Sequence, residues 1–227
     1  METAQREMSF LLAGPERRVL RWIAARLPRS WMPDHLTAIG VLGALTVGAG
    51  YALSSRHAWW LWLASVGLFV NWFGDSLDGT LARVRQIERP KYGYYLDHMV
   101  DAIATIAIGA GIGLSPFVAL PVALAIVILY LCLSINVYLE SAVLGVFDLG
   151  YGVFGPTEMR ILLVLANTGL FAGAVGTGLS GPAVARIANV VLALVCVAMA
   201  YALLARVRIN LIRLARIEPP RLSGLDR

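Results

Sequence analysis

Long apolar runs separated by short polar segments dominate the chain. A bilayer core about 30 Å thick is crossed by a helix of roughly 20 apolar residues. Six segments meet that length, and we expect them to be transmembrane helices: about 36–55, 58–83, 94–114, 118–140, 159–179 and 183–206. Glycine and proline mark several of the junctions. The pattern predicts an all-α, polytopic membrane fold.

An amphipathic segment at 15–27 precedes the first span. Apolar residues recur in it at helical spacing, whereas its arginines lie mostly on another face; the apolar residues are Val19, Leu20, Ile23 and Leu27. This pattern predicts a helix in the lipid headgroup plane, although a solvated basic helix has the same pattern. We therefore divide the chain into an N-terminal cytoplasmic arm (1–35), a six-helix transmembrane domain (36–206) and a basic cytoplasmic tail (207–227).

Composition agrees with a membrane protein. Hydrophobic residues make up 59% of the chain and the mean hydropathy is +0.73, above the range of soluble domains. Cys132 and Cys196 each lie in an apolar run, so we expect core residues and no disulfide framework. The arginine-rich N-terminal arm lacks the short apolar core and cleavage site of a secretory signal.

Basic residues indicate the orientation. The net charge is +5, but the positive residues gather beside apolar segments, where they meet anionic lipid, so we expect no nucleic-acid partner. The arm holds six arginines, six more follow from Arg206 onward, and the loop between the second and third spans holds Arg83, Arg85, Arg89 and Lys91. The opposite loops hold almost none. Both termini and this loop are therefore predicted to be cytoplasmic.

Four aspartates lie at membrane depth near this cytoplasmic loop. Asp75 and Asp78 come near the end of the second span, and Asp97 and Asp101 near the start of the third. Intramembrane carboxylates are costly and usually functional. The members of each pair are three or four residues apart and share a helix face, so packing of the two helices would bring four carboxylates together.

Such a cluster needs cations, because clustered carboxylates repel one another and take up protons. Oxygen ligands favour Mg²⁺ or Mn²⁺. Zinc is not expected, since no cysteine accompanies the site and His98 points about 100° away from Asp97 on a helix. A divalent-cation transporter is an alternative, but it would need polar residues continuing to the far side of the membrane.

Small and basic residues follow the first acid pair. Gly79 and Ala82 leave space for a bulky group beside the helix, and close helix packing has the same requirement. Arg83 suits a diphosphate, or it anchors the cytoplasmic end of the span.

Eight of these residues form an ordered signature. It consists of Asp75, Asp78, Gly79, Ala82, Arg83, Gly93, Asp97 and Asp101. In order and spacing it resembles the signature of the CDP-alcohol phosphotransferase family, with nine residues between Arg83 and Gly93.

The resemblance implies roles for these residues. Asp75, Asp78 and Asp97 would bind two Mg²⁺ or Mn²⁺ ions, and Asp101 would act as general base and also touch a metal. The CDP pocket would be formed by Asp78, Gly79, Ala82, Arg83 and Gly93.

The resemblance also implies a reaction. An acceptor alcohol attacks the β-phosphorus of a CDP-alcohol and releases CMP, in phospholipid synthesis. CDP-diacylglycerol is the favoured donor because the chain is compact, whereas the Asp97-His98 pair resembles the choline and ethanolamine branch, which acts on diacylglycerol. An inactive scaffold that kept the metal site is a further alternative. We further expect membrane lipids as partners, assembly into a homodimer, and a location in the bacterial inner membrane.

The acceptor pocket is expected at the cytoplasmic ends of other spans. Its candidate residues are Asn136, Glu140, Glu158 and Arg160, which would otherwise snorkel or cap helix ends. A phosphorylated acceptor would require several basic residues, which Arg160 with Arg206, Arg208 and Arg213 would supply, unless the last three anchor lipid.

Overall fold

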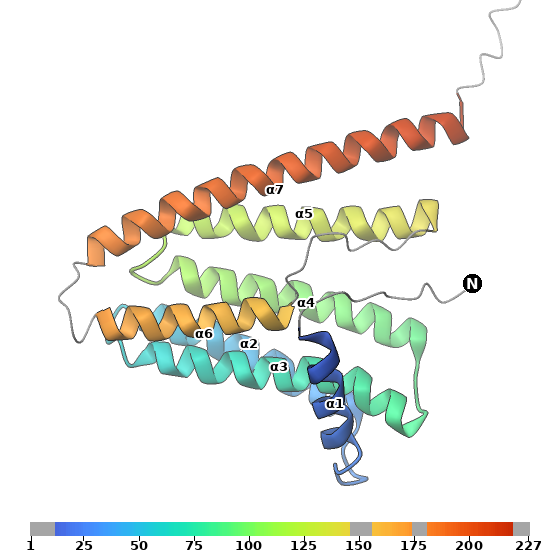
Figure 1. The fold of residues 1–227 in the computed structure, drawn as a ribbon, viewed down its shortest axis with the longest axis horizontal. Coiled ribbons are helices and arrows are strands. Elements are labelled where there is room, and N and C mark those ends of the chain that lie inside the picture. Colours follow the sequence, from blue (N-terminus) through green and yellow to red (C-terminus); the bar gives the residue numbers. More distant parts are fainter. Residues whose placement is uncertain (1–11, 146–155, 174–180, 220–227) are drawn as a thin grey trace, which may run out of the picture.

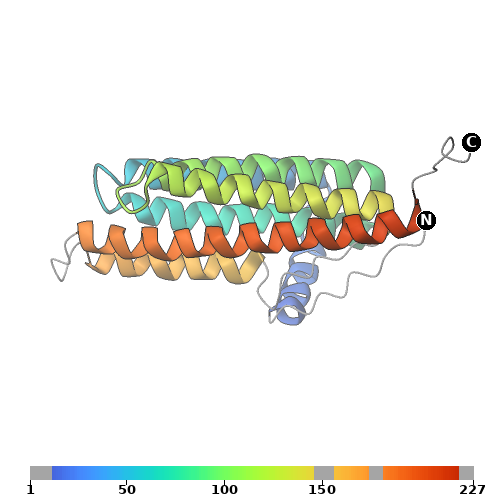
Figure 2. The ribbon, with the colours of Figure 1, turned by 90° about the horizontal axis from the view of Figure 1, so that it is seen from above.

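The computed structural model describes residues 12–145, 156–173 and 181–219. Within these ranges every element is a helix: α1 (Ala13–Ala24), α2 (Pro33–Leu53), α3 (Trp60–Arg85), α4 (Pro90–Gly113), α5 (Leu120–Leu144), α6 (Pro156–Ala172) and α7 (Gly181–Ile217). Helices α2 to α7 run alongside one another, and α1 lies across the bundle (Figures 1 and 2). The all-α prediction is confirmed.

In the described part of the chain, four helices are long and apolar enough to cross a membrane: α2, α4, α5 and Pro182–Ile217 of α7. The other two predicted spans correspond to α3 and α6, which do not meet this criterion within the described residues. The second half of α3 carries acids and arginines, and α6 is described for only 17 residues. The chain is a multi-pass integral membrane protein, and the count of six spans stays a prediction.

Glycines let α2 approach both α3 and α4. A Cβ at Gly74 of α3 would lie 2.2 Å from the backbone nitrogen of Gly40, and one at Gly111 of α4 would lie 2.3 Å from the carbonyl oxygen of Gly48. Such distances leave no room for a side chain, so these glycines permit the close packing of α2 against both helices. Helices α3 and α4 pack closely against α2 and much less against each other.

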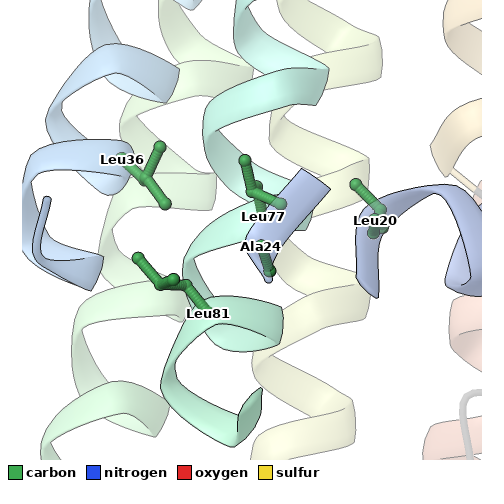
Figure 3. Packing of buried hydrophobic residues seen from close by; sticks show 5 residues of the cluster. All are labelled: Leu20, Ala24, Leu36, Leu77 and Leu81. Carbon is green, nitrogen blue, oxygen red and sulfur yellow. The ribbon is translucent and has the colours of Figure 1, made fainter. Parts of the chain in front are cut away.

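The amphipathic helix α1 packs on the acid-bearing half of α3. Leu20 and Ala24 meet Leu36, Leu77 and Leu81 in one buried cluster (Figure 3). Burying an aliphatic side chain of this kind stabilises a fold by roughly 1.5–3 kcal/mol.

The exposed face of α1 is both basic and apolar. Val19, one of the apolar residues of the predicted amphipathic helix, is 50% exposed. Trp22 is 58% exposed, and the Arg26 guanidinium lies over its ring. This composition suits a membrane surface.

The last helix is longer than the sequence pattern predicted. The apolar run of the sixth span ends near 206, but α7 continues through Ile217. Arg206, at the end of the predicted span, and Arg208 and Arg213, in the predicted tail, therefore all lie on α7.

Candidate functional site

A left-handed turn places the two acid-bearing helices. Gln86 follows α3 with φ of 57°, and its amide donates to the carbonyl of Arg83. Pro90 then opens α4 at a position where its missing N–H costs nothing. The chain reverses within a few residues, and the second half of α3 comes to face the first half of α4.

Three carboxylates converge across the space between these helices. Oxygen atoms of Asp75, Asp97 and Asp101 lie within 4.8 Å of one another, and all three residues are partly buried. An all-carboxylate donor set fits a hard divalent cation such as Mg²⁺ or Mn²⁺. The predicted convergence of α3 and α4 acids is therefore observed for these three residues.

Asp78 has a different environment. Thr37 of α2 donates its hydroxyl to Asp78 Oδ2 at 2.6 Å, and the Gly79 amide donates to Oδ1 at 2.5 Å. Asp78 is not one of the three converging acids, so its part as a fourth metal ligand stays a prediction. Thr37 was not identified from the sequence, where it reads as an ordinary residue of the first apolar span.

Arg160 of α6 reaches the carboxylate group directly. Its Nη2 lies 2.6 Å from Asp75 Oδ2, and its Nε donates to Asn71 Oδ1 at 3.0 Å. Asn71 is 4% exposed and donates its amide to the Gly40 carbonyl at 3.0 Å. This chain of hydrogen bonds restrains the Asp75 carboxylate from α2, α3 and α6 together.

The sequence carried one signal for Asn71. It is a polar residue inside an apolar run, four positions before Asp75 and therefore on the same helix face. Its partner Arg160 was predicted for the acceptor pocket and proves to contact Asp75, which places it beside the candidate metal centre.

Neither signature glycine is packed against another helix. A Cβ at Gly79 would meet only the Arg83 guanidinium, at 3.5 Å or more, and a Cβ at Gly93 would meet nothing within 4 Å. Arg83 is exposed and donates to Thr80 Oγ1 at 3.3 Å. These positions therefore leave an accessible surface beside a cation, which suits a phosphate-bearing ligand. Ala82, between them in the chain, is partly buried.

The three other acceptor candidates have different environments. Glu140 is 8% exposed and pairs with Arg206 of α7 at 3.3 Å. Glu158 is equally buried and accepts from the Leu12 amide at 2.9 Å. Asn136 Nδ2 is buried with no hydrogen-bond partner within the described residues. The structure thus brings Arg160 to the carboxylates and links the two glutamates to neighbouring helices.

His98 packs between aromatic rings. Its imidazole lies 4.1 Å from the Tyr94 ring and 4.4 Å from the Tyr138 ring, centroid to centroid, and Nδ1 lies 3.5 Å from Asp97 Oδ2. It is not one of the residues that converge with Asp75 in the described part of the chain. These ring contacts give His98 a packing role between α4 and α5.

Two loop arginines have specific partners beyond their effect on orientation. Arg85 donates to backbone carbonyls of Leu27, Pro28 and Trp31 in the α1–α2 connection. Arg89 pairs with Asp34 at 2.5 Å, and this hydrogen bond raises the pKa of the Arg89 guanidinium further above its ordinary value. Both interactions hold the start of α2 against the α3–α4 turn.

Comparisons with known proteins agree with this site. The sequence model of the family described as CDP-alcohol phosphatidyltransferase matches residues 30–205. Cholinephosphotransferase 1 of Danio rerio is 26% identical over 156 residues, which is 63% of this chain and 39% of that protein. Phosphatidylinositol phosphate synthase of Cutibacterium acnes is 36% identical over 100 residues, 43% of this chain and 45% of that protein.

The matches therefore span less than half the length of these curated relatives. The family match, in contrast, covers most of this chain and includes α2 to α5 and the whole of the acid-bearing stretch. The chain belongs to the CDP-alcohol phosphatidyltransferase family.

Proposed function

We propose that this protein transfers a substituted phosphate group from a CDP-alcohol to an acceptor alcohol and releases CMP, in phospholipid synthesis. The observation that carries the proposal is the convergence of Asp75, Asp97 and Asp101 beside the open surface at Gly79 and Arg83. A metal centre and a diphosphate surface are the parts that phosphoryl-type transfer requires. A divalent-cation transporter is disfavoured by family membership.

The residues have distinct parts in this reaction. Asp75, Asp78, Asp97 and Asp101 would hold two Mg²⁺ or Mn²⁺ ions, whose charge polarises the diphosphate and stabilises negative charge on its oxygens. Gly79, Ala82 and Gly93 leave room for the CDP moiety, to which Asp78 also contributes, and the Arg83 guanidinium neutralises a phosphate oxygen. Positioning and charge neutralisation then account for most of the catalysis.

The transfer itself moves one proton. The acceptor hydroxyl oxygen forms a bond to the β-phosphorus, the bond from that phosphorus to the bridging oxygen breaks, and CMP leaves with the bridging oxygen. Asp101 accepts the hydroxyl proton. Its carboxylate suits this part because it belongs to the converging group while projecting from α4, opposite the α3 residues that face the nucleotide.

CDP-diacylglycerol is our proposed donor, with a phosphorylated acceptor. Arg160 at the carboxylate centre supports an anionic acceptor, because a guanidinium binds phosphate through paired hydrogen bonds. The relative named phosphatidylinositol phosphate synthase has the higher identity of the two, 36%. Asn136, Glu140 and Glu158 would line the remainder of the acceptor pocket.

A CDP-choline or CDP-ethanolamine donor with diacylglycerol as acceptor is the second candidate. The relative named cholinephosphotransferase aligns over 63% of this chain, a longer stretch than the other relative. The length of this match supports the second candidate. The first candidate is supported by the higher sequence identity and by Arg160 at the carboxylate centre.

The membrane arrangement extends the proposal. We also propose six spans in a bacterial plasma membrane, and the arginine distribution supports cytoplasmic termini and a cytoplasmic site. Large apolar side chains are exposed on α5 and α7, among them Leu139, Val197 and Tyr201. They would contact lipid or a second copy of the chain, which agrees with a homodimer.

One experiment separates the candidates. Purified protein in detergent with Mg²⁺ or Mn²⁺ receives radiolabelled CDP-diacylglycerol or CDP-choline and a panel of acceptors: glycerol phosphate, inositol, inositol phosphate, serine and diacylglycerol. We expect CMP release with CDP-diacylglycerol and a phosphorylated acceptor. Turnover with CDP-choline and diacylglycerol alone would select the second candidate, and no CMP with any pair in a folded protein would refute both.

A further inference from the structure

Glu16 joins three helices next to the candidate metal centre. Its Oε1 accepts from Trp72 Nε1 at 2.6 Å, from Thr157 Oγ1 at 2.7 Å and from Ser76 Oγ at 3.4 Å. Glu16 is the acid of an otherwise basic helix, α1, and it is partly buried. A carboxylate in such a place requires these donors, because burying it without them is costly.

The partners of Glu16 surround the residues that restrain Asp75. Trp72 and Ser76 lie on either side of Asp75 along α3. Thr157 stands in the first turn of α6, three residues before Arg160, so the two side chains leave neighbouring parts of the helix. Glu16 therefore ties α3 to α6 at the level where Arg160 crosses to Asp75.

A second bond attaches the same turn of α6 to α1. The Leu12 amide donates to Glu158 Oε1 at 2.9 Å. Farther along α6, Asn167 donates to Ser65 of α3, and Phe171 meets the rings of Trp59 and Trp62 edge to face. The far end of α6 is thus held by α3 itself, whereas its first turn is held by α1.

We propose that Glu16 is a positioning residue: by holding the first turn of α6 against α3, it keeps the Arg160 guanidinium on the Asp75 carboxylate. Glu16 contacts neither the converging carboxylates nor the open surface at Gly79, so it acts through Arg160. The expected effect on acceptor binding rests on the proposed function. The expected effect on the Asp75 carboxylate and its metal affinity does not.

Loss of the contact between Arg160 and Asp75 should change metal affinity and acceptor affinity in opposite directions. Arg160 competes with a divalent cation for Asp75, since both are positive and both bind carboxylate oxygens. Release of Arg160 therefore strengthens metal binding. The same release removes a guanidinium from the site and weakens binding of an anionic acceptor. General loosening of the fold would weaken both.

The test uses full-length protein purified in detergent, with Mn²⁺ binding followed by the electron paramagnetic resonance of the free ion. The variants are Glu16→Ala, Arg160→Ala and the double variant. Glu16→Gln is the conservative variant, because its amide oxygen still accepts the bonds from Thr157 and Trp72. Glu88→Ala is the matched control, since Glu88 is an exposed acid in the α3–α4 loop.

We expect Glu16→Ala and Arg160→Ala each to bind Mn²⁺ about tenfold more tightly, because one neighbouring opposite charge changes the proton affinity of a carboxylate by about tenfold or more. The double variant should bind no more tightly than Arg160→Ala, because both changes act through the same contact. Glu16→Gln should return most of the way to the parent value, and Glu88→Ala should match it.

Three results would overturn the proposal: a Glu16→Ala variant that binds Mn²⁺ as Glu88→Ala does, one that binds it more weakly, or one whose effect persists in the Arg160→Ala background. If Glu16→Ala does not elute as a folded species, Thr157→Val removes one bond and must shift Mn²⁺ affinity in the same direction. Tighter Mn²⁺ binding without CMP release from any donor would refute the proposed function and leave the positioning role standing.

Discussion

Arg160 and Asp75, 85 residues apart in sequence, are joined by a hydrogen bond of 2.6 Å between Nη2 and Oδ2. The same guanidinium donates Nε to Asn71, so its plane is held by two partners on one face of α3. A planar, forked cation can satisfy both at once, and the compact ammonium of lysine cannot. Through this pair, a basic residue expected to bind the acceptor directly contacts the carboxylate centre.

Arg160→Lys keeps the charge but loses the fork. We expect the acceptor KM to rise about tenfold, the cost of one charge-assisted hydrogen bond. The KM for the CDP-alcohol should change much less, because Gly79 and Arg83 face the donor. Steady-state CMP release at varied acceptor and fixed donor, and the reverse, measures the two constants. Equal rises in both would place Arg160 outside the acceptor pocket.

Asp101→Asn replaces the proposed base with a group of the same shape that cannot accept the proton. We expect kcat to fall about 10²- to 10⁴-fold, the usual contribution of a general base. The protein should still elute from a sizing column like the parent. CMP release under saturating substrates is the measurement, and near-normal turnover would remove Asp101 from the mechanism.

Thr37→Val removes the hydroxyl that donates to Asp78 and keeps the shape of the side chain. We expect kcat/KM for the CDP-alcohol to fall about tenfold, since a hydrogen bond to a charged group is worth about 1.5–3 kcal/mol. Thr37→Ser restores the hydroxyl and should recover most of the activity. If Thr37→Ser is as impaired as Thr37→Val, the loss comes from packing instead of the hydroxyl.

Gly74→Ala and Gly79→Ala form a matched pair on one helix. The new methyl at position 74 would lie 2.2 Å from the Gly40 nitrogen, whereas at position 79 the nearest atom is the end of Arg83 at 3.5 Å. We expect Gly74→Ala to lower the thermal unfolding temperature sharply. Gly79→Ala should leave it unchanged or raise it, because alanine favours a helix by about 1 kcal/mol.

The same pair separates packing from ligand binding. Gly79→Ala should raise the KM for the CDP-alcohol, since the methyl occupies the surface proposed for the nucleotide. Differential scanning fluorimetry and donor titrations read the two effects. An unchanged donor KM in a folded Gly79→Ala variant would show that the open surface does not bind the donor.

Removal of divalent metal tests the carboxylate centre as a whole. Chelation with EDTA should abolish CMP release, and Mg²⁺ or Mn²⁺ should restore it, because clustered carboxylates with oxygen-only ligands suit these ions. Asp97→Asn should require a higher Mg²⁺ concentration for half-maximal activity. Full activity in EDTA after exhaustive dialysis would contradict the metal dependence.

The sequence by itself determined the helices and the faces that they present. Periodicity and length located every described helix of the bundle, since burial in a membrane imposes a local apolar pattern of known length. Spacing of three and four residues placed each acid pair on one face and predicted that four carboxylates converge; Asp75, Asp97 and Asp101 do so in the described residues, and Asp78 is not in that group.

Tertiary structure alone decided which distant side chains complete the site. The bonds from Thr37 to Asp78 and from Arg160 to Asp75 join residues 41 and 85 positions apart. The Glu16 bonds to Trp72 and Thr157 span 56 and 141 positions. Such pairs depend on the rotation and axial shift of packed helices, which no local pattern encodes. For the same reason, only the packed bundle distinguishes Gly74, pressed against α2, from Gly79, where a Cβ would meet only the end of the Arg83 side chain.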